Sequence, residues 1–80
     1  MMPTEVHLPT ASDVATIRHG LGLSQAEFSA LLGISTGTLQ GWEALRREPD
    51  GPARVLLLIA KYQPKAIRKA FAMAIANQTA

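Results

Sequence analysis

Apolar residues recur at spacings of three and four along most of this 80-residue chain, which is the spacing of amphipathic helices. Serine, glycine and proline punctuate the pattern where helices begin and end. The pattern predicts five helices, at about 11–20, 24–32, 35–45, 52–62 and 64–76. The sequence therefore predicts an all-α domain over 10–76, preceded by a flexible or extended arm at 1–9 and followed by a frayed end at 77–80.

The second and third predicted helices lie around a very short turn. Their apolar residues share one face in each helix, at Phe28, Leu31 and Leu32 in the first and at Leu39 and Trp42 in the second. Between them, Gly33 can adopt a positive φ and end the first helix sharply, and Ser35 can cap the second. This arrangement is typical of a helix-turn-helix unit.

The outward face of the third helix is small and polar, with no acidic residue. It carries Thr36, Gly37, Thr38, Gln40 and Gly41. A glycine costs about 1 kcal/mol against alanine inside a helix, so a purely structural helix would not favour two of them. Small residues permit close approach to a DNA groove, and threonine and glutamine can bind base edges. We therefore expect these five residues to contact bases, with Gly37 and Gly41 contributing clearance.

The stretch from Gln25 to Glu43 resembles the helix-turn-helix of phage lambda-type repressor and Cro proteins, the XRE family, in its Gln-Ala-Glu start, Gly33, Leu39 and Glu43. The resemblance covers about residues 14–70. It implies a five-helix lambda repressor-like fold that binds double-stranded operator DNA. It also implies that Gln25 contacts a phosphate, and that Arg18 pairs with Glu43 to hold the third helix against the first.

The continuation is similar to a narrower group, the HigA-type and MqsA-type antitoxins and related regulators. The similar features are Trp42-Glu43, Arg46-Arg47, Pro49, Gly51-Pro52-Ala53 and the apolar run Val55–Ala60. This group usually has glycine where this chain has Leu45, so the usual glycine helix cap is missing. The resemblance implies an antitoxin that represses its own operon, with a HigB-type or similar toxin as a possible partner.

Positive charge is unevenly distributed, although the net charge is only +2. Residues 1–45 contain a single lysine or arginine, Arg18, whereas no acid follows Gly51. Arg46 and Arg47 directly follow the third helix, so we expect them, with Gln25 and Ser35, to contact phosphates. The basic residues within 61–69 fit a phosphate-binding stripe and a solvated helix face equally well.

The fourth and fifth helices provide most of the remaining apolar residues. The fourth is apolar nearly all round at Val55–Ala60, which predicts a central core helix. Hydrophobic residues make up 48% of this short chain, which favours a second copy as a partner. We expect Ala70, Ala74 and Ile75 of the fifth helix to form a homodimer interface. For the arm, strand pairing through 5–8, toxin binding and a frayed end all stay open.

The sequence offers little for catalysis. It has no cysteine, its two histidines are far apart, and neither phosphate-loop glycine motif is present. We therefore expect no enzyme activity, cofactor or metal site. The longest apolar run is too short to span a membrane, and the lack of cysteine fits the cytoplasm. A stand-alone phage-type regulator without a toxin, and a protein-interaction module that does not bind DNA, are the alternatives.

Overall fold

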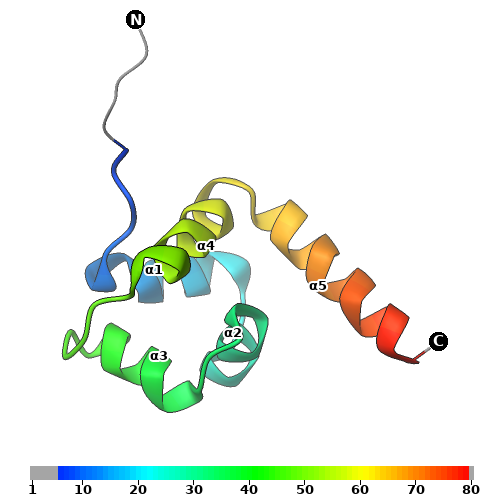
Figure 1. The fold of residues 1–80 in the computed structure, drawn as a ribbon, viewed down its shortest axis with the longest axis horizontal. Helices are drawn as coiled ribbons and strands as arrows, with labels where there is room; N and C mark the ends of the chain where they lie inside the picture. The colour runs from blue at the N-terminus through cyan, green and yellow to red at the C-terminus, as the bar shows by residue number, and fades with distance from the viewer. Residues whose placement is uncertain (1–5, 80) are drawn as a thin grey trace, which may run out of the picture.

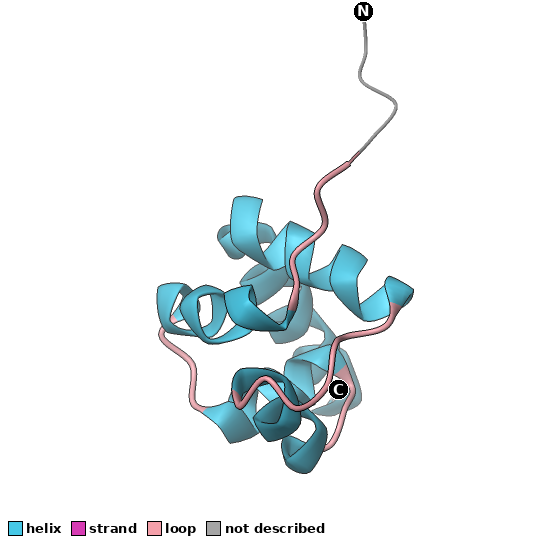
Figure 2. Ribbon diagram, turned by 90° about the vertical axis from the view of Figure 1, so that its left-hand side faces the viewer, coloured by secondary structure: helices cyan, strands magenta, loops and turns pink. Residues whose placement is uncertain are grey.

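A computed structural model describes residues 6–79, in which every regular element is a helix (Figures 1 and 2). The helices are α1 (Ala11–Leu21), α2 (Gln25–Leu32), α3 (Thr36–Glu43), α4 (Gly51–Tyr62) and α5 (Pro64–Thr79). The predicted all-α, five-helix fold is confirmed. The first four helices surround the core, and α5 projects from it (Figure 1).

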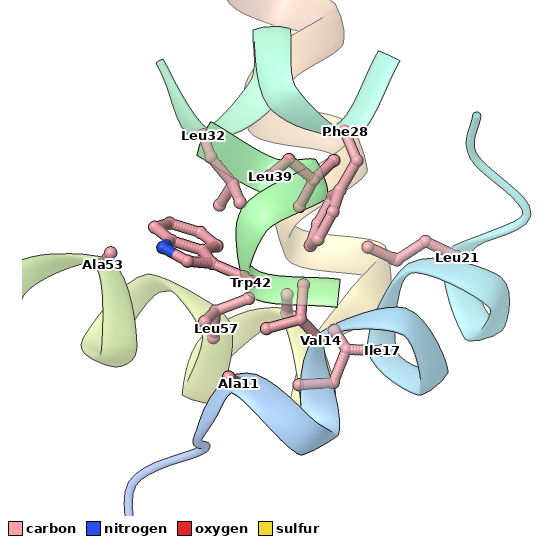
Figure 3. Close-up of a cluster of buried hydrophobic side chains, with 11 residues drawn as sticks. Ala11, Val14, Ile17, Leu21, Phe28, Leu32, Leu39, Trp42, Ala53 and Leu57 are labelled. Atoms are coloured by element: carbon pink, nitrogen blue, oxygen red, sulfur yellow. The ribbon is translucent and has the colours of Figure 1, made fainter. Parts of the chain in front are cut away.

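The core forms where α3 packs between the other helices (Figure 3). Leu39 and Trp42 of α3 contact apolar side chains from α1, α2 and α4. The buried apolar residues are Ala11, Val14, Ile17, Leu21, Phe28, Leu32, Leu39, Trp42, Ala53, Leu57 and Ala60. None of them comes from α5, whose Ile67 only packs against the edge of this cluster. The position of α3 is therefore fixed by α1, α2 and α4.

The caps of α2 and α3 set the turn between them. Ser24 Oγ accepts from the backbone N–H of Glu27 (3.1 Å), and Ser35 Oγ accepts from that of Thr38 (3.0 Å). Gly33 ends α2 with a φ of 72°. Its lack of a side chain makes this left-handed conformation inexpensive, so the chain can turn directly into α3.

The end of α3 differs from the prediction. The helix stops at Glu43 instead of reaching residue 45, because Leu45 adopts a left-handed φ of 61°. The Leu45 N–H donates to the Trp42 carbonyl (2.9 Å) and the Arg46 N–H to the Gly41 carbonyl (2.8 Å), which is a Schellman motif. Leucine thus occupies the position that glycine normally takes, at a cost of about 1 kcal/mol.

The prediction that α4 is a central core helix is wrong for half of its circumference. Only Ala53, Leu57 and Ala60 are buried. The opposite side exposes Val55, Leu56, Ile59 and Tyr62, with Val55 46% and Tyr62 64% exposed. The reason is tertiary: α4 packs mainly against α1 and α5, and no described segment covers its other side.

The two ends of the domain also differ from expectation. Residues 77–79, expected to fray, continue α5. The part of the arm that the structure describes, residues 6–9, contains no regular element, and Glu5 of the possible strand lies outside the described residues. Arg54 holds this segment, since its Nε donates to the Pro9 carbonyl (2.9 Å) and its Nη2 to the Leu8 carbonyl (3.3 Å). Residues 6–9, the described part of the arm, leave the domain on the side opposite α3 (Figure 1).

Candidate nucleic-acid interface

One side of α3 is open to solvent and carries only small or uncharged side chains. Gly37 and Gln40 are exposed, and so is Ala44, which follows the last residue of the helix. Positions three, four and seven residues apart share one side of a helix, so these residues form a continuous line that we call the α3 strip. A methyl group on Gly37 would have one neighbouring atom within 4 Å, the Ser35 hydroxyl oxygen at 3.9 Å, and otherwise open space around it. The α3 strip is therefore narrow and low, as entry into a DNA groove requires.

Thr36 and Thr38, both expected to contact bases, are half-buried. The Thr36 hydroxyl lies 3.1 Å from that of Ser29, which itself donates to the Ala26 carbonyl (3.0 Å). Thr36 thereby ties the start of α3 to α2. The Thr38 hydroxyl lies 2.9 Å from the Ser35 hydroxyl at the cap of α3. Both threonines border the α3 strip, but their hydroxyl groups already have partners within the protein.

The expectation that Gly41 contacts bases does not fit its position. Gly41 is buried, and a Cβ atom there would lie 3.5 Å from Cδ of Arg47. The aliphatic part of Arg47 therefore lies across this glycine and separates it from solvent. The Schellman turn causes this arrangement, because it folds the chain after Leu45 back onto α3.

Gln25 connects α2 to the edge of the α3 strip. Its Nε2 donates to Oε1 of Glu43 (3.1 Å), and its Oε1 accepts from Nε2 of Gln40 (3.3 Å). The amide of Gln40 still has a free N–H and a free carbonyl oxygen among the hydrogen bonds of residues 6–79. Gln25 thus orients Gln40 while leaving it able to bind a base edge.

The structure contains an ion pair between Arg18 and Glu43. Nε of Arg18 lies 2.7 Å from Oε2 of Glu43, and Nη2 lies 3.0 Å from Oε1, so the contact is bidentate. Nη1 of Arg18 also donates to the Leu23 carbonyl (3.0 Å). The pair fixes α3 against α1 beside the buried Trp42.

This ion pair also neutralises the negative charge of Glu43 at the edge of the α3 strip. The hydrogen bond from Arg18 lowers the pKa of Glu43 below its ordinary 4.5, with the Gln25 hydrogen bond acting in the same direction and burial opposing both. The same hydrogen bond raises the pKa of Arg18. Glu43 is therefore ionised and neutralised by Arg18 at neutral pH.

Arg47 lies on the other side of the α3 strip from Gln25, and Arg46 precedes it in the chain. Residues 41 and 43 are about 160° apart around a helix, so Arg47 over Gly41 and Gln25 on Glu43 border opposite sides. Both arginines are exposed, and within residues 6–79 their guanidinium groups have no hydrogen bond or ion pair. Ser35 is exposed at the start of the helix. A ligand that covers the α3 strip would meet polar donors on both sides of it.

Ala44 is the surface residue that sequence reasoning missed. The predicted third helix, at about 35–45, includes Ala44 in its last turn, and the small side chain of Ala44 carries no polar signal. Its spacing of four residues from Gln40 and seven from Gly37 was the available clue. An exposed methyl group here suits contact with the methyl group of thymine.

Other kinds of site find no support in the part of the chain described. Residues 6–79 bring no three histidine, cysteine or acidic side chains together in a way that could hold a metal ion. Nor is any of the described helices long and apolar enough to cross a membrane.

Two comparisons of the sequence with known proteins agree with this helix-turn-helix arrangement. Residues 14–62, more than half of the chain, match the family model described as helix-turn-helix. The chain is also 33% identical over 55 residues to antitoxin HigA-2 of Vibrio cholerae serotype O1. That alignment covers 69% of this chain and 53% of HigA-2, so the chain spans about half the length of this relative. Both matches confirm the resemblance that the residues around Gln25–Glu43 indicated.

Proposed function

Because this chain belongs to the XRE-type helix-turn-helix family of DNA-binding regulators, we propose that it represses transcription by binding operator DNA as a homodimer. The observation that carries the proposal is the α3 strip, free of acidic residues and bordered by Gln25 on one side and by Arg47 on the other, with Arg46 exposed next to Arg47 in the chain. Bound across a promoter in the cytoplasm, such a protein would exclude RNA polymerase sterically.

In this proposal α3 enters the major groove, and the α3 strip faces the bases. Gln40 makes the principal base contact, because its amide has one donor and one acceptor free. Gly37 provides clearance and Ala44 an apolar surface. Thr36 and Thr38 contribute at the margin through their methyl groups and remaining lone pairs, since their hydroxyl groups are already engaged.

The phosphate contacts come from residues on both sides of the α3 strip. Arg46 and Arg47 bind one strand with their exposed guanidinium groups. Gln25 binds the other strand through the second N–H of its amide, at the N-terminus of α2, where the helix dipole favours an anion. Ser35 adds its exposed hydroxyl. These contacts set the position of α3 without reading sequence.

The homodimer rests on the apolar surface that α5 leaves uncovered. Ala70, Ala74 and Ile75 are exposed, and with Leu31 and Phe71 they border an apolar groove of about 600 Å³ between α2, α4 and α5. A second copy would cover this surface and place two α3 helices on half-sites about 34 Å apart, one turn of DNA.

We further propose that the protein is the antitoxin of a toxin–antitoxin pair and represses its own operon. The support is the similarity to HigA-2, which is named an antitoxin. The described part of the arm leaves the domain opposite α3, so a toxin bound at this end would not obstruct DNA (Figure 1). Co-purification with a small toxin expressed from the same operon supports this role, and a chain that purifies alone from that operon is a stand-alone regulator.

The primary test is a fluorescence-anisotropy titration on a duplex from the chain's own upstream region and on a scrambled duplex, at several salt concentrations. We expect at least about a thousandfold tighter binding to the upstream duplex. Equal, weak and steeply salt-dependent binding to both would leave only non-specific phosphate attraction and would defeat the repressor proposal.

A matched pair of variants separates base contacts from phosphate contacts. Gln40→Ala should cost about 1–3 kcal/mol on the upstream duplex and little on the scrambled one. Arg47→Ala should weaken binding to both duplexes equally and reduce the salt dependence. Equal losses on both duplexes for Gln40→Ala would show that this side chain does not read bases.

A further inference from the structure

The basic residues of α5 do not form one uniform surface. Lys65, Arg68 and Lys69 are all exposed, but Arg68 alone turns back toward the rest of the domain. Its Nη2 lies 3.4 Å from where a Cβ atom on Gly22 would be, so its guanidinium lies against the turn between α1 and α2. Arg68 also lines an apolar groove of about 520 Å³ with Leu23 and Ala26, which Lys65 and Lys69 do not line.

The guanidinium of Arg68 has no acceptor of its own. Within residues 6–79 it makes no hydrogen bond and no ion pair. Glu27 lines the same groove, but its carboxylate accepts from the Ser24 N–H (2.9 Å), and this hydrogen bond lowers its pKa. Gly22 caps the C-terminus of α1, where the helix dipole favours a cation. The guanidinium is thus held at this turn with its N–H donors unused, and a bound phosphate would supply the acceptor that they lack.

The location of Arg68 continues the edge at which DNA is proposed to lie. Gly22 precedes Gln25 by three residues, and Gln25 borders the α3 strip through Gln40 and Glu43. A DNA strand that passes the N-terminus of α2 would therefore run toward the α1–α2 turn. Arg68 is the described basic side chain of α5 placed at that turn.

We propose that Arg68 binds a backbone phosphate next to the one bound at the N-terminus of α2, so that α5 contributes to the DNA-binding surface as well as to the dimer. This inference rests on the proposed function. The ligand is a DNA phosphodiester, and the contact adds affinity without sequence preference. It divides the basic stripe of 61–69 into one residue that contacts DNA and others that face solvent.

The test compares Arg68→Ala with Lys69→Ala, because each removes one positive charge from neighbouring positions of the same helix. Anisotropy titrations between 50 and 200 mM salt would use the upstream duplex and the scrambled duplex. Loss of one phosphate contact lowers the slope of log K against log salt by about 0.9. We expect this change for Arg68→Ala on both duplexes, a slope close to the original for Arg68→Lys, and no change for Lys69→Ala.

Two results would overturn the inference. Equal slopes for Arg68→Ala and Lys69→Ala would mean that only long-range charge is involved. An unchanged slope combined with a lower melting temperature for Arg68→Ala would mean that Arg68 serves the fold, for example by pairing with Glu27. Sedimentation at the titration concentrations keeps the oligomeric state matched. If the unaltered protein bound the two duplexes equally, the repressor proposal alone would fail. The inference about Arg68 would still be tested, because the salt slopes of the variants are compared on each duplex separately.

Discussion

The two halves of this domain differ in how completely they bury their large apolar side chains. In α1, α2 and α3 the large residues Val14, Phe28 and Leu39 are completely enclosed. In α4 and α5, residues of the same kind, such as Val55, Met73 and Ile75, remain open to solvent. The polar groups follow the same division, because the Arg18–Glu43–Gln25 network lies entirely within the first half.

Under the proposed function, this contrast corresponds to two tasks, DNA binding by the first half and dimerisation by the second. A surface that reads DNA must hold its groups in fixed positions, and buried packing with paired polar groups achieves this. A surface that associates with another copy must keep apolar area available until the partner arrives. The 48% hydrophobic content thus exceeds what one 80-residue core uses, and the excess is concentrated on α4 and α5.

The largest expected effect tests this division directly. Phe28→Ala should lower the free energy of unfolding by about 3–5 kcal/mol, because it removes a fully buried ring from the core. Ile75→Ala, at a residue that is 49% exposed, should leave unfolding of the monomer nearly unchanged but weaken dimerisation. Urea denaturation at protein concentrations low enough for the monomer to dominate measures the first quantity, and sedimentation measures the second. Comparable losses of monomer stability would show that α5 belongs to the core after all.

The ion pair between Arg18 and Glu43 should give the next largest effect. Arg18→Ala leaves the half-buried Glu43 carboxylate without its main donor and should cost about 2 kcal/mol of stability. Lys69→Ala, which removes an exposed cation from α5, is the matched control and should cost little. Thermal denaturation of both variants at neutral pH is the measurement, and equal losses would contradict a structural role for the pair.

The same pair predicts a loss of stability in acid. The folded pKa of Glu43 lies below its ordinary 4.5, so below that pH the unfolded chain takes up a proton more readily than the folded one. The contribution is therefore complete above about pH 5 and declines as the pH falls through the folded pKa. The free energy of unfolding should fall less steeply from pH 6 to pH 3 for Arg18→Ala than for the unaltered protein. Denaturation curves that give the same pH dependence for both would argue against the pair as the cause.

The two glycines of α3 allow a comparison within one helix, because Gly37 lies on the α3 strip and Gly41 is covered by Arg47. Gly37→Ala and Gly41→Ala should each stabilise the helix by about 0.5–1 kcal/mol, because neither added methyl group meets a close contact. Gly37→Ala should nevertheless weaken DNA binding, since it thickens the α3 strip. Gly41→Ala should bind nearly as well as the original, because the stem of Arg47 covers that position. Equal effects on binding would remove the distinction between exposed and buried glycine.

The smallest effect concerns the end of α3. Leu45→Gly should raise stability by about 0.5 kcal/mol, because it relieves a left-handed leucine that is 66% exposed and makes no core contact. Ala44→Gly is the control and should be destabilising, since Ala44 has an ordinary negative φ of −86°. Melting temperatures measure both, and a loss of stability for Leu45→Gly would point to a packing role for the leucine.

Sequence reasoning succeeded where the signals were local. Ser24, Ser35 and Gly33 act within a few residues of their own positions, so the caps and the tight turn could be predicted from spacing alone. The Arg18–Glu43 contact joins residues far apart in the chain and came from the resemblance to a family. The identity of that family could be inferred because its motif lies on a single continuous stretch.

Other features depend on how elements meet in space and could not be predicted. An apolar stripe on α4 shows that burial is possible, but which side receives a neighbour depends on the directions of α1 and α5. Spacing alone places Gly41 on the exposed side of the third helix. Its burial depends on Arg47 lying across it, which requires the turn at Leu45. Arg68 and Lys69 are adjacent in sequence and chemically similar, so only the position of α5 distinguishes them.

The clamp that Arg54 places on the Leu8 and Pro9 carbonyls makes the arm a suitable place for a reporter. These 80 residues include no cysteine, so His7→Cys would create a single labelling position in them, next to the clamp. A dye there would move with the rigid domain and lie opposite α3, away from the proposed DNA surface. Energy transfer from it to either end of a short duplex would reveal which way the domain faces along DNA.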